Sequence, residues 1–220
     1  MIRVLTVAFA PEPGRRASVA QQALAVLKVE AWAPRGTAVQ FMTAPCAWWG
    51  AADAIFEAAQ SADAVVLLGA TDAATAQTPR YARNEADPSR ADALGLRWPG
   101  GVLAPGAPLV MRTTLPALGL AQALTFAGLP TEAPPEACRF TPNRCLFDLT
   151  LRAPEKPSGL ILLPMTLEAG RQEGLAGRTT RLDVLAGVRA ALTFAAAAAE
   201  LAHASEALIP CQASGRRRAS

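Results

Sequence analysis

The chain has 220 residues, of which 51% are hydrophobic and 18% charged, and its formal net charge is +3. Disordered chains and acidic tails are poor in apolar residues and rich in like charges, so this composition excludes both and predicts a globular protein with a sizeable core. Arg216, Arg217 and Arg218 lie together near the end of the chain, and no stripe of basic and aromatic residues occurs elsewhere, so nucleic acid is not an expected partner.

The start of the chain is an apolar run with one positive charge, shorter than the hydrophobic region of a signal peptide. It predicts an opening strand over Val4–Phe9. Ser18 is the expected N-cap of a helix over Val19–Leu27, with Gln21 three residues later completing a capping box. A second strand is expected over Ala38–Met42, where larger apolar residues alternate with small or polar ones.

A helix is expected over Ala51–Ala59, followed by a continuous apolar run over Ala64–Gly69 that is typical of a buried parallel strand. The segment 71–106 differs, because it holds four of the 18 prolines, four arginines and little apolar periodicity. We expect a long loop there, and loops of that length in compact domains are usually functional or disordered. A weak strand is expected over Leu109–Thr113.

The second half of the chain continues the alternation of helices and strands. Pro116 predicts the first turn of a helix over Leu118–Ala127, and Gly128 predicts its end. Another buried strand is expected over Gly159–Pro164. A long helix rich in alanine is expected over Leu182–Ala204, packed across the whole domain.

This alternation predicts an α/β protein, a three-layer α/β/α sandwich with a mixed, mostly parallel central sheet. We expect one domain over residues 1–205 and a C-terminal tail over 206–220 that is partly disordered. The longest apolar segment, Ala190–Ala199, is too short to cross a bilayer, so no membrane segment is expected.

A search for catalytic or metal-binding motifs finds little. There is no Gly-rich phosphate loop and no Gly-x-Ser-x-Gly elbow. The spacing of Cys46, Cys138, Cys145 and Cys211 fits no zinc pattern, so neither a metal nor a cofactor is expected. The one histidine, His203, lies within the last helix, where a place on the helix flank is expected rather than a role as general base.

Two adjacent tryptophans, Trp48 and Trp49, follow Pro45 and Cys46. Neighbouring side chains in an extended segment point to opposite sides, so one indole is expected to be buried and the other available to a partner. Packing in the core or against another subunit is favoured over a platform for a ligand.

Several short motifs occur in a fixed order at near-constant spacing: Phe9-Ala10-Pro11 with Gly14; Ala64–Gly69 with Thr78, Pro79 and Asn84; Thr113-Thr114-Leu115-Pro116; Ala121–Leu124 with Gly128-Leu129-Pro130; Ala137–Arg144; and Gly159–Pro164. Over roughly residues 2–200 this order resembles pyroglutamyl peptidase I (pyrrolidone-carboxylate peptidase). That family consists of cytosolic cysteine peptidases that remove an N-terminal 5-oxoproline from peptides. The resemblance implies a cytoplasmic protein that forms dimers or tetramers.

The family's catalytic residues do not carry over to the matching positions. The nucleophilic cysteine falls on Pro142, the histidine on Leu162, and the glutamate on Pro79, or on Arg80 if the loop is shifted by one residue. Proline has no side-chain proton donor or acceptor, and leucine cannot accept a proton, so no cysteine-peptidase chemistry is expected. Cys145 lies close to one helical turn beyond Pro142 and would still lack a base.

The leading hypothesis is therefore a non-catalytic member of the family that keeps the fold for binding or assembly. The resemblance also implies residues that line the family's binding pocket. In this sequence these fall on Phe9, Glu12, Ala70 and Asn143.

Two alternatives remain open. One is a hydrolase or transferase of different chemistry in the same cleft, acting on a peptide or a small anionic ligand held by the arginines Arg80, Arg83, Arg139 and Arg144. The other is a purely structural subunit that associates with itself or with an active relative.

Overall fold

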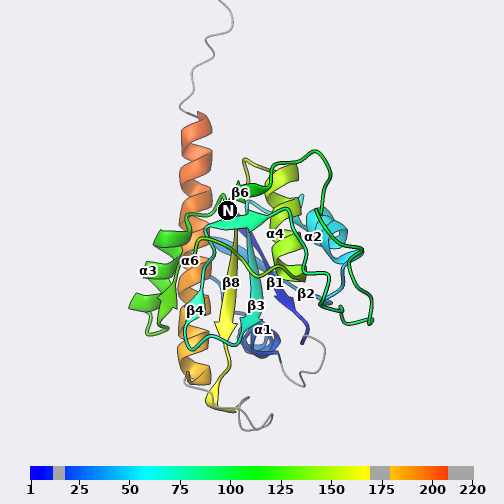
Figure 1. Cartoon of the computed structure of the whole chain (residues 1–220). Coiled ribbons are helices and arrows are strands. Elements are labelled where there is room, and N and C mark those ends of the chain that lie inside the picture. The colour runs from blue at the N-terminus through cyan, green and yellow to red at the C-terminus, as the bar shows by residue number, and fades with distance from the viewer. Residues whose placement is uncertain (12–17, 169–178, 208–220) are drawn as a thin grey trace, which may run out of the picture.

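A computed structural model of the chain describes residues 1–11, 18–168 and 179–207, and its centre is a six-stranded sheet between two layers of helices (Figure 1). The strand order is β2-β1-β3-β8-β4-β7. All neighbouring strands are parallel except β8 and β4, which are antiparallel. The expected three-layer sandwich with a mixed, mostly parallel sheet is confirmed. The strand bounds are β1 Ile2–Phe9, β2 Thr37–Ala44, β3 Ala64–Thr71, β4 Ala76–Gln77, β7 Thr131–Glu132 and β8 Ser158–Pro164.

Strands β1, β3 and β8 form the buried middle of the sheet. Leu67 in β3 is in register with Val7 in β1 on one side and with Leu160 in β8 on the other. Helices cover both faces, so these three strands are apolar at almost every position rather than at every second one. The continuous apolar runs in the sequence therefore located these strands to within two residues at each end.

Three helices cover one face of the sheet: α1 (Val19–Val29), α3 (Ala117–Phe126) and α6 (Arg181–Ala207). Their buried side chains pack in one core cluster with every second residue of β3 and β8. The Ser18 hydroxyl accepts a hydrogen bond from the Gln21 N–H, which confirms the expected N-cap of α1. In Figure 1 the long α6 runs beside the sheet, with α3 on its outer side.

Two helices cover the other face, α2 (Ala51–Ala59) and α4 (Thr141–Arg152). The sequence patterns predicted α2 but not α4. Proline is a poor helix former, and Pro142 obscures the beginning of α4. It occupies the second position of the helix, where a backbone N–H has no partner inside the helix, so the proline costs no hydrogen bond there.

Helix α6 is longer than its apolar alanine run suggests. Within Arg181–Ser205, an 18-residue window has a mean hydropathy of 1.5, which by length and composition would satisfy the requirements for a membrane span, and half of that window is buried inside the domain. Val188, Leu192 and Ala195 belong to the core cluster with α1, α3 and the sheet. This packing against the domain accounts for the apolar composition of α6.

The segment expected to be a long loop contains two short strands. β4 extends the main sheet, and β5 (Tyr81–Arg83) pairs with β6 (Val110–Arg112) in a separate antiparallel sheet. The weak strand expected over Leu109–Thr113 is thus present as β6. Strands of two or three residues carry little periodicity, and the sequence patterns did not predict β4, β5 or β7.

Two buried polar side chains hold the rest of this segment in place. The Asn84 amide donates to the Ala104 carbonyl at 2.8 Å and accepts from the Ala104 N–H at 2.7 Å. The Asp92 carboxylate accepts hydrogen bonds from the N–H groups of Trp48, Leu94 and Leu96 at 2.8–2.9 Å. The bonds between Asn84 and Ala104 stay within the segment, and the segment is tied to the rest of the domain by the bond from Trp48 to Asp92 and by backbone bonds from Ala93 to Cys46 and from Asp87 to Arg139.

Trp48 and Trp49 lie in a bend rather than in an extended segment, but the expected difference in burial between the two indoles is present. Trp48 is fully buried and its ring meets the edge of the Phe140 ring, with 5.1 Å between the centroids. Trp49 is 47% exposed and stacks on Trp98 at 5.3 Å. One indole is thus part of the core and the other lies at the surface.

Helix α6 approaches its neighbours closely at two glycines, and these provide a stability test. A Cβ on Gly187 would lie 2.9 Å from the Cβ of Leu129, whereas a Cβ on Gly119 in α3 would meet only the tip of the Phe194 ring, which can swing away. Alanine raises helix propensity by about 1 kcal/mol at either site. We expect Gly187→Ala to lower the free energy of unfolding in urea by about 1–3 kcal/mol through overpacking, and Gly119→Ala to leave it unchanged or raised. A Gly187→Ala protein more stable than the parent would contradict this packing.

Candidate functional site

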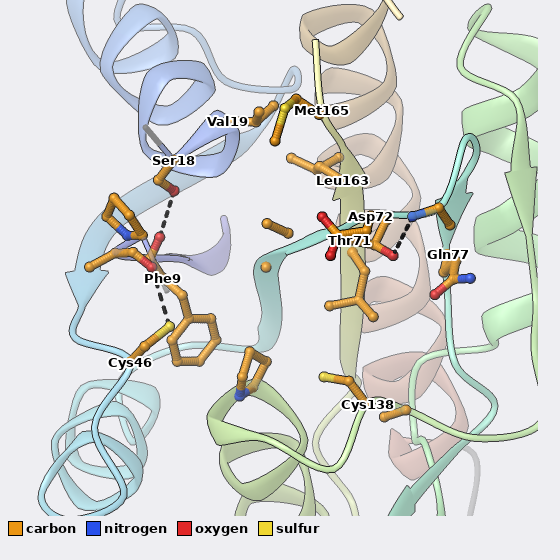
Figure 2. Close-up of a pocket in the computed structure, with 18 of the residues that line it drawn as sticks. Phe9, Ser18, Val19, Cys46, Thr71, Asp72, Gln77, Cys138, Leu163 and Met165 are labelled. Atoms are coloured by element: carbon orange, nitrogen blue, oxygen red, sulfur yellow. Dashed lines mark hydrogen bonds between the residues drawn. The ribbon is translucent and has the colours of Figure 1, made fainter. Parts of the chain in front are cut away.

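A cavity of about 470 Å³ opens at the carboxyl ends of β1, β3 and β8, beside the beginnings of α1 and α4 (Figure 2). Strand β2 lies on one side of β1 in the sheet, whereas the later strands β3 and β8 lie on the other side, so the order of strands reverses direction at β1. This divergence is the point in an open α/β sheet where ligands generally bind. The topology alone therefore indicates this cavity as the candidate site.

One buried part of the lining is apolar and comes from four separate segments. Phe9 ends β1, Gly69 lies near the end of β3, Pro142 lies in the first turn of α4, and Leu162 belongs to β8. All four are buried. We call these residues the floor of the cavity.

Gly69 is the point at which the floor residues meet. It is in register with Leu162 on the neighbouring strand. A Cβ placed on Gly69 would lie 2.8 Å from Cδ2 of Leu162 and 3.4 Å from Cγ of Pro142. The structure therefore brings Pro142 and Leu162, 20 positions apart in the sequence, to the same point at the end of β3.

The outer part of the lining is polar. Asp72, Gln77, Arg90 and Glu136 contribute its charged and amide side chains, and we call these four residues the rim. The Arg90 guanidinium lies 4.3 Å from the centroid of the Phe140 ring. Gln77 is in register with Leu162, so its position follows directly from the sheet.

Two thiols line the cavity and a third lies behind it. Cys46 is buried, with its Sγ 3.2 Å from the Ala10 carbonyl oxygen, and Cys138 is half-buried. Cys145 is fully buried in α4, and its burial, together with the nearby Asp148 carboxylate, raises the pKa of its thiol far above the ordinary value. A thiol in that state is not a nucleophile at neutral pH.

The imidazole of His203 is remote from the cavity. Its Nε2 lies 3.6 Å from the Asp63 carboxylate, and Asp63 immediately precedes β3. The cavity is at the opposite end of that strand, roughly 20 Å away at the usual rise per residue of a strand. Since the chain has one histidine, no imidazole lines this cavity.

Only some of the residues implied by the family resemblance line the cavity. Phe9 and Ala70 line the cavity, whereas Glu12 lies outside the described residues. Asn143 is fully buried and does not belong to the described lining; its amide accepts from the Arg83 N–H at 2.8 Å and donates to the Arg83 carbonyl at 2.9 Å. Pro79 is buried and also lies outside the described lining.

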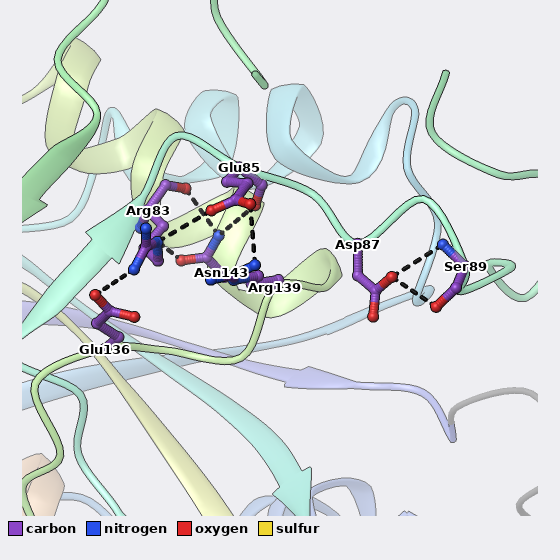
Figure 3. Close-up of polar contacts among 7 residues, drawn as sticks. All are labelled: Arg83, Glu85, Asp87, Ser89, Glu136, Arg139 and Asn143. Atoms are coloured by element: carbon purple, nitrogen blue, oxygen red, sulfur yellow. Dashed lines mark hydrogen bonds and ion pairs between the residues drawn. The ribbon is translucent and has the colours of Figure 1, made fainter. Parts of the chain in front are cut away.

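Two of the four arginines that were candidates for binding an anion belong to an ion-pair network beside the cavity (Figure 3). Arg83 pairs with Glu136 and with Glu85, and Arg139 pairs with Glu85 at 3.0 Å. The hydrogen bond from Arg83 lowers the pKa of the Glu136 carboxyl group and raises that of the Arg83 guanidinium. These arginines hold neighbouring loops together through carboxylates of the chain itself.

The other two arginines also lie away from the described lining. Arg144 is stacked 4.3 Å from the centroid of the Trp98 ring and lies 3.8 Å from the Asp148 carboxylate. The Arg80 guanidinium is 5.9 Å from the centroid of the Tyr81 ring. The four arginines therefore do not converge on the cavity, contrary to the arrangement that an anion-binding cleft requires.

Sequence patterns did not predict the rim. Its residues come from segments as distant as Asp72 and Glu136, in loops and in a two-residue strand. No periodic signal marks such positions, so only the fold reveals them. Within the described part of the chain, no cluster of three His, Cys, Asp or Glu side chains could hold a metal ion.

Comparison with known proteins gives matches in structure and not in sequence. No family model matches the chain, and none of the curated proteins shows significant sequence similarity to it. Pyroglutamyl peptidase I from Bacillus amyloliquefaciens aligns with a TM-score of 0.79 at 22% identity, over 90% of this chain and 98% of the other. Pyrrolidone carboxyl peptidase from Thermus thermophilus aligns with a TM-score of 0.76 at 22% identity, over 87% and 99%.

A variant of pyrrolidone carboxyl peptidase from the hyperthermophile Pyrococcus furiosus gives the same result, with a TM-score of 0.79 at 20% identity over 88% of this chain and 98% of the other. Each match spans almost the whole of the solved chain. At this level of identity the likeness shows architecture and not activity. The chain therefore has the fold of pyroglutamyl peptidase I.

Proposed function

We propose that this protein is a cytoplasmic, non-catalytic relative of pyroglutamyl peptidase I that uses the cavity for binding. One observation supports this most strongly. The two positions that the sequence resemblance assigns to the family's cysteine and histidine, Pro142 and Leu162, both contact the same point beside Gly69 on the floor of the cavity. Positions aligned by motif thus meet in space, as a nucleophile and its base must.

The chemistry of these side chains supports loss of peptidase activity. Thiol catalysis needs a thiolate, a base within hydrogen-bond reach and a group that orients the base. Pro142 and Leu162 supply neither a nucleophile nor a base. Pro142 also lacks an N–H, so the start of α4 offers one backbone donor fewer to an oxyanion.

A relocated cysteine nucleophile has little support. Cys145 is buried with a raised pKa, and Cys46 is buried. Cys138 is the more accessible thiol of the lining, but the only imidazole of the chain is at the far end of β3. A different hydrolase or transferase acting on an anion is supported less than binding, because its four candidate arginines lie outside the described lining.

Hydrolysis of a fluorogenic pyroglutamyl aminocoumarin tests this proposal. We expect the purified full-length protein to release no coumarin above the rate of buffer, because its floor holds no thiol and no imidazole. An active pyroglutamyl peptidase I serves as the positive control. A rate that is abolished by Cys145→Ser or by Cys138→Ser would show a working thiol and contradict the proposal.

A second role, as a subunit of a homo-oligomer, is favoured by the surface of α3. This helix contains no charged residue, and its outer side exposes 60% of Leu118 and 91% of Phe126. The two residues flank a groove of about 280 Å³ between α3 and the residues around β7. Across a two-fold axis, the Phe126 ring of each copy would face the groove of the other, because a two-fold interface uses the same patch on both chains.

Light scattering at micromolar concentration tests this role. We expect a mass of at least two chains for the parent protein and of one chain for Phe126→Glu, because burying an unpaired carboxylate in a groove that has no basic side chain costs free energy. Val29→Glu changes an equally exposed apolar residue on α1 and provides the matched control, with no expected effect. A monomeric parent, or dissociation by the control substitution, would count against α3 as an interface.

A further inference from the structure

One part of the cavity lining is apolar and another part is polar. The floor residues Phe9, Pro142 and Leu162 carry no polar side-chain atom, and Gly69 carries no side chain at all. The polar side chains of Asp72, Gln77, Arg90 and Glu136 lie in the rim. A ligand that fills the cavity therefore places its innermost atoms against carbon and its outer atoms against polar groups.

The floor disfavours a polar end group. A lactam ring or a carboxylate pushed against Phe9 and Leu162 would lose its hydrogen bonds to water and would find no donor or acceptor on the floor side chains. The nearby Ser18 hydroxyl and Cys46 thiol already donate to the Phe9 and Ala10 carbonyls. An aliphatic or aromatic group would leave water at no such cost. The floor thus selects for apolar groups.

The rim disfavours an anion. Glu136 is already paired with Arg83, and the other two charged rim side chains, Asp72 and Arg90, carry opposite charges, so the rim has no net positive charge. Gln77 contributes an amide, which is both a donor and an acceptor and pairs well with a neutral amide of a ligand. The polar part of a matching ligand is therefore neutral and resembles a peptide bond.

The size of the cavity suits a small molecule or the end of a peptide. Its volume of about 470 Å³ is within the range of small-ligand sites. The contact of Leu162 with Gly69 fixes the inner boundary, because the leucine has no space to retreat toward β3. An end group of the size of a leucine or phenylalanine side chain fits these limits better than a long chain does.

We propose that the cavity binds an apolar end group attached to a neutral amide, such as a hydrophobic acyl group or the hydrophobic residue at a blocked peptide end. The end group packs against Phe9, Pro142 and Leu162, and the amide lies beside Gln77. This inference rests on the proposed binding function of the cavity. It changes the ligand from the polar 5-oxoproline ring of the peptidase family to an apolar one.

A chemical-shift titration of the ¹⁵N-labelled full-length protein tests the inference. The probes are N-acetyl-leucinamide, pyroglutamic acid amide and inorganic phosphate. We expect N-acetyl-leucinamide to shift the backbone amides of Ala70 and Gln77 and to bind about tenfold more tightly than the other two, in line with burial of one aliphatic side chain. Absence of shifts with N-acetyl-leucinamide, shifts confined to α3, or tighter binding of pyroglutamic acid amide or phosphate would overturn the inference.

Three variants separate floor polarity from folding. Leu162→Asn should weaken binding of N-acetyl-leucinamide about tenfold, since it places an amide in the floor. Leu162→Met keeps an apolar floor and should bind within about threefold of the parent, even if Leu162→Asn proves to be unfolded. Val29→Asn, at the exposed end of α1, should leave binding unchanged. Equal binding by a folded Leu162→Asn protein would exclude the floor as the binding surface.

The loss of peptidase activity and the apolar class of the ligand are tested independently. Turnover of the pyroglutamyl substrate would overturn the loss of catalysis. Preference of a catalytically inactive protein for pyroglutamic acid amide would overturn only the apolar ligand class.

Discussion

The candidate site depends on the absence of a side chain at Gly69. At the end of β3, the strand β8 and the first turn of α4 approach so closely that a Cβ would lie 2.8 Å from Leu162 and 3.4 Å from Pro142. These distances are shorter than or at the limit of ordinary carbon contacts. Because the glycine permits this approach, a leucine and a proline from distant segments close the floor of one cavity. In a hydrolase the same approach would bring a nucleophile to its base. Gly69 therefore fixes how close the two positions lie, and the side chains at those positions determine which chemistry is possible.

Much of the fold could be predicted because its largest elements carry strong patterns. Buried parallel strands such as Ala64–Thr71 are long apolar runs, and helix α1 begins at a Ser18 cap. The remaining elements depend on tertiary contacts. β4 and β7 have two residues each and exist because they extend a sheet, and the segment after β5 is ordered by hydrogen bonds of Asn84 and Asp92. Such contacts join residues far apart in sequence and leave no local signal.

The candidate site was predictable only in part, for a related reason. Motif order paired Pro142 with Leu162, and the fold brings them together. The resemblance also implied a pocket position for Asn143, but successive residues in the first turn of a helix point in different directions, and Asn143 faces β5 instead of the cavity. The positive charge of the four arginines also did not indicate the position of the site, because Arg83 and Arg139 pair with nearby carboxylates.

The central claim is that Pro142 and Leu162 occupy facing positions on the floor, and alkylation of an introduced thiol tests it most directly. Pro142→Cys would be compared with the double variant Pro142→Cys/Leu162→His, with the site of iodoacetamide labelling located by mass spectrometry. An adjacent imidazole lowers the pKa of a thiol, so we predict much faster labelling of the introduced thiol at pH 6–7 in the double variant than in the single one. Equal labelling rates in two folded proteins would show that the two positions do not face each other and would contradict this account.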